Sequence, residues 1–169
     1  GIDMPIEQHR LAQAIQSANA AVFTAATDEE EYQGMGTTIV SGFFTEEGVY
    51  LAHIGDSRAY RFRGGELVQC TEDHSLANEY VRMGILSPED VEYFPYKNVI
   101  TRACGLTDEV EVDVSYAELE VGDLYLFCSD GLSEMVPDSE LDKLLDTDED
   151  LDALCQTLID KANENGGAD

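Results

Sequence analysis

The stretch that decides the fold is residues 49–70, VYLAHIGDSRAYRFRGGELVQC. It contains three segments rich in branched and aromatic residues, at 49–55, 59–63 and 66–70, and a glycine pair at 64–65 separates the last two. Branched and aromatic residues favour strands, and glycine pairs favour tight turns. The stretch therefore predicts one strand followed by a β-hairpin, and with it a fold built on antiparallel sheet.

The flanking sequence extends this pattern in both directions. Upstream, residues 37–44 predict a strand that pairs with 49–55 through a turn at 45–48. Downstream, the same composition predicts three further strands, at 99–104, 110–115 and 124–128. The last of these is a continuous apolar run, which is typical of a strand buried on both faces.

Helices are expected at both ends of the chain and once in the middle. Residues 5–25 place apolar side chains at steps of three and four, which is typical of an amphipathic helix over a core. A shorter helix is expected at 76–83, and an irregular surface loop before Asn98. Two C-terminal helices follow, with cap signals at Ser139 and Thr147, each three residues before an aspartate.

Length and charge limit the classes of protein that fit. The chain has 169 residues, enough for one domain, and 36 acidic against 9 basic residues give a net charge of −27. Such a polyanion is repelled by nucleic acid and by anionic lipid, so we expect neither as a partner. There is no apolar stretch long enough to span a membrane and no leader, and we expect a soluble, cytoplasmic protein.

The cysteines favour the same compartment. Cys70, Cys104, Cys128 and Cys155 are far apart, form no C-x-x-C pair and mostly lie in apolar runs. This pattern predicts buried, reduced thiols in place of disulfides or a zinc site.

Three aspartates are candidate metal ligands. Asp56 and Asp130 each follow an expected core strand beside a glycine, and Asp169 follows the pair Gly166-Gly167. A carboxylate at the end of a core strand is held rigidly and partly desolvated, which suits a hard cation that prefers oxygen ligands. The alternatives are that Asp56 and Asp130 simply mark turns and that Asp169 is a frayed terminal residue.

Other site chemistry finds less support. Ser57 and Ser129 lack the strained elbow of a nucleophilic serine. The histidines His9, His53 and His74 show no metal-ligand spacing. His53 is expected in the core or on a sheet face, and His74 in a polar turn.

Taken in order, six segments resemble the bacterial branch of the metal-dependent PP2C-type (PPM) protein serine/threonine phosphatases. They are GMGTT at 34–38, AHIGDSRAY at 52–60, TEDHS at 71–75, ITRA at 100–103, CSDGL at 128–132 and GGAD at 166–169. The resemblance implies an α+β fold, a four-layer α/β/β/α sandwich of two antiparallel sheets flanked by helices, here incomplete. It also implies a centre of two manganese or magnesium ions. A water that these metals activate hydrolyses phosphoserine or phosphothreonine in proteins, with no catalytic group separate from the metal ligands.

The resemblance also assigns roles to individual residues. Asp130 and Asp169 match ligands of the metal centre, and Asp56 matches a ligand of an additional, weaker metal site of bacterial members. Residues 75–98 match the variable flap beside the active site. The flap aromatics Tyr93, Phe94 and Tyr96 are candidates for contact with a protein substrate, the alternative being that they pack the loop itself.

Two departures from the family pattern shape the expected function. Members begin with a strand that carries an acidic ligand and continue to a segment whose aspartate bridges both metals; residues 1–169 contain neither, and they end at the late aspartate. We therefore expect one PP2C-like domain over 1–169, truncated at both ends and inactive alone. In the complete protein it would counteract a bacterial-type Ser/Thr kinase. The alternatives are an inactive phosphatase-like binding module and an unrelated acidic cation-binding protein.

Overall fold

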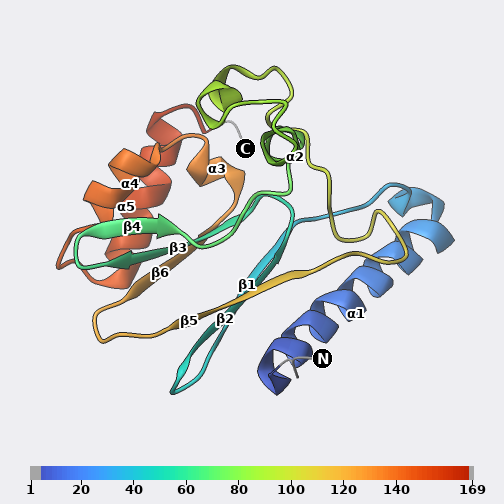
Figure 1. The fold of residues 1–169 in the computed structure, drawn as a ribbon, viewed down its shortest axis with the longest axis horizontal. Helices are drawn as coiled ribbons and strands as arrows, with labels where there is room; N and C mark the ends of the chain where they lie inside the picture. Colours follow the sequence, from blue (N-terminus) through green and yellow to red (C-terminus); the bar gives the residue numbers. More distant parts are fainter. Residues whose placement is uncertain (1–4, 168–169) are drawn as a thin grey trace.

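The computed structural model describes residues 5–167 and contains two three-stranded antiparallel sheets with helices around them (Figure 1). The first sheet has the order β1-β2-β5 and the second β4-β3-β6. The strands are β1 (Ile39–Phe44), β2 (Gly48–Ile54), β3 (Arg58–Arg63), β4 (Glu66–Gln69), β5 (Asp113–Glu118) and β6 (Leu124–Cys128). The stretch 49–70 thus supplies the central strands of both sheets, as the sequence predicted.

Helical segments lie at both ends of the chain and in the middle. They are α1 (Ile6–Asp28), α2 (Leu76–Arg82), α3 (Asp130–Ser133), α4 (Asp138–Leu145) and α5 (Leu151–Glu164), with 3-10 turns η1 (Glu30–Tyr32) and η2 (Pro88–Tyr93). Among the described residues, no helix has the length and apolarity needed to cross a membrane.

Alternation along β2 buries both faces of the first sheet. Ala52 and Ile54 pack against Ile15 of α1. Val49 and Leu51, which point the other way, pack with Ala59 of β3 between the two sheets. Because successive side chains of a strand point to opposite faces, a single apolar strand joins two layers of core.

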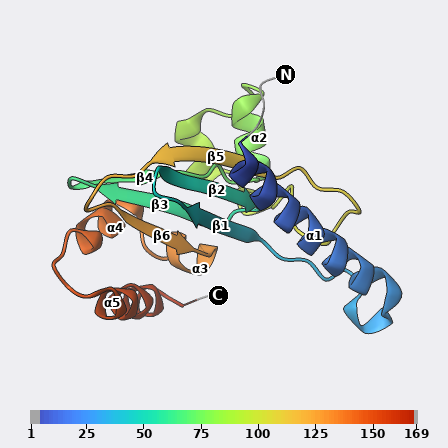
Figure 2. The ribbon, with the colours of Figure 1, turned by 90° about the horizontal axis from the view of Figure 1, so that it is seen from below.

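The second sheet repeats this arrangement on its outer side. Tyr60 and Phe62 of β3 pack against Leu141 of α4 and Leu154 and Leu158 of α5. Helix α1 and the pair α4–α5 therefore lie on opposite sides of the two stacked sheets (Figure 2). The predicted α+β sandwich of four layers, helix on sheet on sheet on helix, is confirmed.

Two of the predicted strands differ in the structure. Residues 99–104 make no strand and pair only through isolated bridges, Ser75 with Ile100 and Thr37 with Cys104. The strand expected at 110–115 lies at Asp113–Glu118, and Val110 and Val112 pack against the cluster around Ile15 before the strand begins, as Val114 does within it. Composition alone does not distinguish an apolar loop from a strand.

The C-terminal caps and the thiols also differ in detail. Helix α4 begins one residue before Ser139, directly after Pro137, whose fixed φ suits the position before a first turn. Helix α5 is capped by Asp150, whose carboxylate accepts the Ala153 N–H at 3.0 Å, and not by Thr147. All four cysteines are free, but only Cys104 is buried and Cys155 is exposed.

Candidate metal centre

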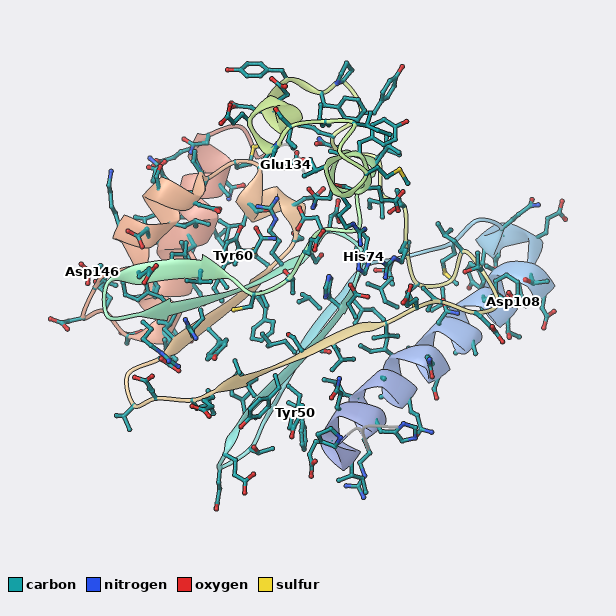
Figure 3. All side chains as sticks on the ribbon, in the orientation of Figure 1. Tyr50, Tyr60, His74, Asp108, Glu134 and Asp146 are labelled. Carbon is teal, nitrogen blue, oxygen red and sulfur yellow. The ribbon has the colours of Figure 1, made fainter. Side chains whose placement is uncertain are left out.

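An acidic cavity of about 590 Å³ lies where α2 and η2 meet the ends of the two sheets. Its acidic lining residues are Asp56, Asp73, Glu92, Asp130 and Glu134, and its basic ones are Arg58 and Lys97. Glu134, at the end of α3, faces the segment that carries α2 and η2 (Figure 3). The cavity brings together Asp56 and Asp130, two aspartates predicted from the sequence that follow strands of different sheets.

A tight bend after β2 positions Asp56. Gly55 has φ +103°, and a Cβ on it would lie 2.4 Å from Cγ2 of Thr38, so only glycine fits without strain. Directly after Asp56, the Ser57 hydroxyl is 2.7 Å from that of Thr38. The backbone on both sides of Asp56 is therefore fixed against the start of β1.

The electrostatics of the cavity favour a cation. Burial raises the pKa of Asp56, and the facing carboxylate of Asp130 raises it further, with smaller contributions from Asp73 and Glu134. Within residues 5–167, neither Asp56 nor Asp130 has a basic partner within salt-bridge distance. Two carboxylates that repel each other without a counter-charge fit the oxygen ligand set of a hard divalent cation such as Mg²⁺ or Mn²⁺.

Asp130 reaches the cavity through a short helical turn. It begins α3 directly after β6, and its carbonyl accepts the Glu134 N–H at 2.8 Å. Strand β6 pairs with β3 along its whole length, with Arg58 opposite Cys128. The position of Asp130 is therefore set by the second sheet, whereas that of Asp56 is set by the first.

A half-buried ion pair forms one wall of the cavity. The Arg58 guanidinium donates to both oxygens of Asp73, with Nη2 at 2.6 Å from Oδ2, and Nη1 donates to the Tyr60 hydroxyl at 2.9 Å. The Tyr60 hydroxyl in turn donates to Asp138 at 3.0 Å. Burial works against the charged Arg58, but these hydrogen bonds raise its pKa. Because the charge of Asp73 is already paired with that of Arg58, we assign Asp73 a structural role.

The predicted flap forms the other wall. Within it, Ser75 caps α2 by accepting the Asn78 N–H at 3.3 Å. The residues of η2 and the following loop that line the cavity are Pro88, Val91, Glu92, Lys97 and Asn98. The aromatic residues Tyr93, Phe94 and Tyr96 are not among the described lining residues. Phe94 packs between Tyr80 and Tyr96, at ring separations of 5.5 and 5.8 Å, and Tyr93 is exposed.

The third predicted ligand, Asp169, lies outside the described residues. The structure therefore brings together two of the three aspartates.

A second cluster, which the sequence did not indicate, lies next to the bend. His53, His74 and Asp113 offer ligand atoms within 4.8 Å of one another, and the two imidazoles stack at 4.5 Å. His74 was expected in a polar turn, yet it is only 1% exposed. The available signal was its place in TEDHS, one of the six family-like segments.

The hydrogen bonds of this cluster argue against a metal there. Nδ1 of His74 accepts the Gly55 N–H at 3.0 Å, and Nε2 lies 3.1 Å from Asp113 Oδ2. A ring whose Nδ1 accepts an N–H is neutral, and burial lowers the pKa of His74 in the same direction. A neutral imidazole has one acceptor nitrogen, and Gly55 already uses it. His53 donates from Nε2 to the Glu72 carbonyl at 2.8 Å, so the backbone holds this ring as well, and His74 is not available as a ligand beside it. The cluster is a hydrogen-bonded scaffold, and the carboxylate cavity is the candidate metal centre.

Comparison with known proteins connects this geometry to an activity. The family model described as Protein phosphatase 2C matches residues 3–166. A curated relative, Serine/threonine phosphatase stp of Listeria monocytogenes, is 40% identical over 159 residues, which cover 94% of this chain and 63% of the relative. The chain thus spans less than two thirds of the length of that relative.

Solved structures agree with the sequence comparison. The serine/threonine phosphatase of S. agalactiae superimposes with a TM-score of 0.89 at 35% identity, covering 100% of this chain and 71% of that one. The catalytic domain of the serine/threonine protein phosphatase PstP, solved in complex with two manganese ions, has a TM-score of 0.85 at 34% identity, covering 99% of this chain and 70% of that one.

Proposed function

The chain belongs to the protein phosphatase 2C family, and on that premise we propose that the protein hydrolyses phosphoserine and phosphothreonine esters in phosphoproteins. The observation that carries this proposal is the pair Asp56 and Asp130, two carboxylates in one cavity without a basic partner among the described residues. An acidic cavity of this kind accepts an anionic phosphate ester only when cations are present.

We propose manganese or magnesium as these cations, two ions with a third in a weaker site. Asp130 and Asp169 would serve the main centre and Asp56 the weaker one. Support comes from the all-oxygen donor set and from the manganese ions of the PstP structure. When bound, such cations lower the pKa of a water molecule and neutralise charge on phosphoryl oxygens.

The chain's own residues supply binding and orientation. Asp56 and Asp130 would hold cations from two different sheets, so the two stacked sheets would determine how the ligands are spaced. The Arg58–Asp73 pair keeps one wall rigid. Lys97 lines the flap side of the cavity and brings a positive charge to a phosphate there.

The proposal extends to substrates and cellular role. Tyr93 and Tyr96 are exposed on the flap beside the cavity, where a protein substrate would contact them. The reaction would reverse that of a Ser/Thr kinase. The four free thiols suit a reducing compartment, and we propose the cytoplasm.

We further propose that residues 1–169 form one phosphatase domain that needs additional sequence for activity. Its described part supplies two candidate carboxylates, whereas a two-metal centre uses several. A phosphatase is favoured over an inactive binding module, because the relatives carry phosphatase names.

The test is manganese-dependent hydrolysis of a phosphothreonine peptide by the full-length protein and by its Asp130→Asn variant. Loss of a ligand should cost more than the roughly 10–100-fold that outer-shell partners of a metal cost. Asp146→Asn is the matched control, because Asp146 is exposed at the end of α4, away from the cavity (Figure 3). The 169-residue chain, assayed beside these proteins, should be inactive.

Three results would each contradict part of the proposal. Equal rates for the wild type and Asp130→Asn would show that Asp130 is not a working ligand. A full-length protein that binds Mn²⁺ but hydrolyses no phosphopeptide would favour the binding module. Activity of the 169-residue chain alone would overturn the claim that it needs more sequence.

A further inference from the structure

We propose that His74 is a positioning residue that holds the bend at Gly55 in the form that presents Asp56 to a cation. The inference rests on the proposed function, since it concerns the Asp56 site. His74 lies at the junction between the sheets and the segment that carries α2 (Figure 3). It is not itself a ligand, because its one acceptor nitrogen is used by the backbone.

Two hydrogen bonds join His74 to the residue before Asp56. The ring Nδ1 accepts the Gly55 N–H at 3.0 Å, and the His74 N–H donates to the Gly55 carbonyl at 2.9 Å. Both polar groups of one peptide residue are therefore held by one histidine. Thr38 also lies close to Gly55, since a Cβ added there would meet Thr38 Cγ2 at 2.4 Å, so the bend is confined by a second neighbour besides His74.

The other ring nitrogen anchors the histidine itself. Nε2–H donates to Asp113 Oδ2 at 3.1 Å, and Asp113 Oδ1 accepts from Arg102 Nη1 at 2.9 Å. The carbonyl of His74 accepts the Thr101 N–H at 2.8 Å. A hydrogen-bonded chain thus runs from Arg102 through β5 and His74 to the end of β2. The hydrogen bond to Asp113 orients the His74 ring and fixes its tautomer, as carboxylates do for metal-binding histidines.

Nδ1 of His74 holds Gly55 and Nε2 holds Asp113. Two substitutions each remove one of these two hydrogen bonds. In His74→Asn the amide oxygen lies near the former Nδ1 and can still accept the Gly55 N–H. In His74→Gln the amide nitrogen lies near the former Nε2 and can still donate to Asp113. Each variant keeps one bond and removes a buried imidazole. Both should therefore lose comparable stability. Only His74→Gln leaves the Gly55 N–H without its acceptor, so only this variant holds the bend by the backbone bond to the Gly55 carbonyl alone.

The experiment measures Mn²⁺ binding by the full-length protein, from the electron paramagnetic resonance signal of free Mn²⁺. Asp56→Asn identifies the ions bound through Asp56, and His9→Gln, at an exposed histidine on α1, is the control. We expect His74→Gln to weaken the Asp56-dependent binding at least about tenfold, as outer-shell changes do. His74→Asn should bind close to wild type, although urea unfolding shows both variants similarly destabilised.

The outcomes separate this inference from the function on which it rests. If wild type and His74→Gln bind Mn²⁺ equally, or if His74→Asn loses as much binding as His74→Gln, His74 is only a structural residue and the inference fails. The proposed function survives both results, provided that Asp130→Asn abolishes hydrolysis. If the wild type binds no Mn²⁺ and has no activity, the proposed function fails, and the inference fails with it.

Discussion

Gly55→Ala tests whether the bend that positions Asp56 is as tightly constrained as the structure indicates. The substitution has two costs. First, Gly55 has φ +103°, and an L residue in left-handed backbone costs about 1–2 kcal/mol. Second, the new Cβ would lie 2.4 Å from Thr38 Cγ2, and overpacking of this kind costs about 1–3 kcal/mol. The total is roughly 2–5 kcal/mol, a large part of the stability of an ordinary domain.

Urea unfolding followed by circular dichroism measures this loss in the free energy of unfolding. Gly64→Ala is the matched control, because Gly64 has φ +58° with nothing within 4 Å of its added Cβ. It should show only the backbone cost of about 1–2 kcal/mol. The difference between the two variants then reports the clash with Thr38.

A second substitution separates the two costs directly. Thr38→Ser removes Cγ2 and keeps the hydroxyl that meets Ser57, so it should recover part of the Gly55→Ala loss in a double-mutant cycle. Recovery is partial because Thr38 Cβ would still lie 2.8 Å from the added atom. The reasoning is refuted if Gly55→Ala costs no more than Gly64→Ala, or if Thr38→Ser leaves the loss unchanged.

Two further predictions concern contacts away from the cavity. Asn19 accepts the buried Gly105 N–H at 2.7 Å and donates to the Thr107 carbonyl at 3.0 Å. Asn19→Ala should therefore lower the free energy of unfolding by at least about 1–3 kcal/mol, measured by differential scanning calorimetry. A negligible loss would show that water replaces the side chain. Hydrogen bonds from Arg63 lower the pKa of Asp123. The pair therefore stabilises the fold at any pH above the ordinary Asp pKa of about 4. This contribution is lost as the pH falls through the lower pKa of the folded state. Asp123→Asn should therefore be less stable than wild type in urea at neutral pH, with the difference disappearing in acid; a difference independent of pH would contradict this.

Much of the architecture could be predicted because it depends on local patterns. The alternation in 49–63 determines which side chains of β2 and β3 face each other and which face helices. The prediction of a strand at 99–104 was wrong because this segment pairs only through isolated bridges, and those bridges depend on Thr37 and Ser75, which are distant in the sequence. Local composition carries no information about such partners.

The sequence by itself determined the family and the candidate ligands Asp56 and Asp130, since a carboxylate beside a glycine after an apolar strand is visible in the chain. Only the tertiary structure decided that these two share a cavity without a basic partner in the described residues, while Asp73 is neutralised by Arg58. It also decided that His74 is buried between Gly55 and Asp113. The physical reason is that ion pairing and burial depend on which residues come into contact across the two sheets, and the spacing of residues along the chain does not predict those contacts.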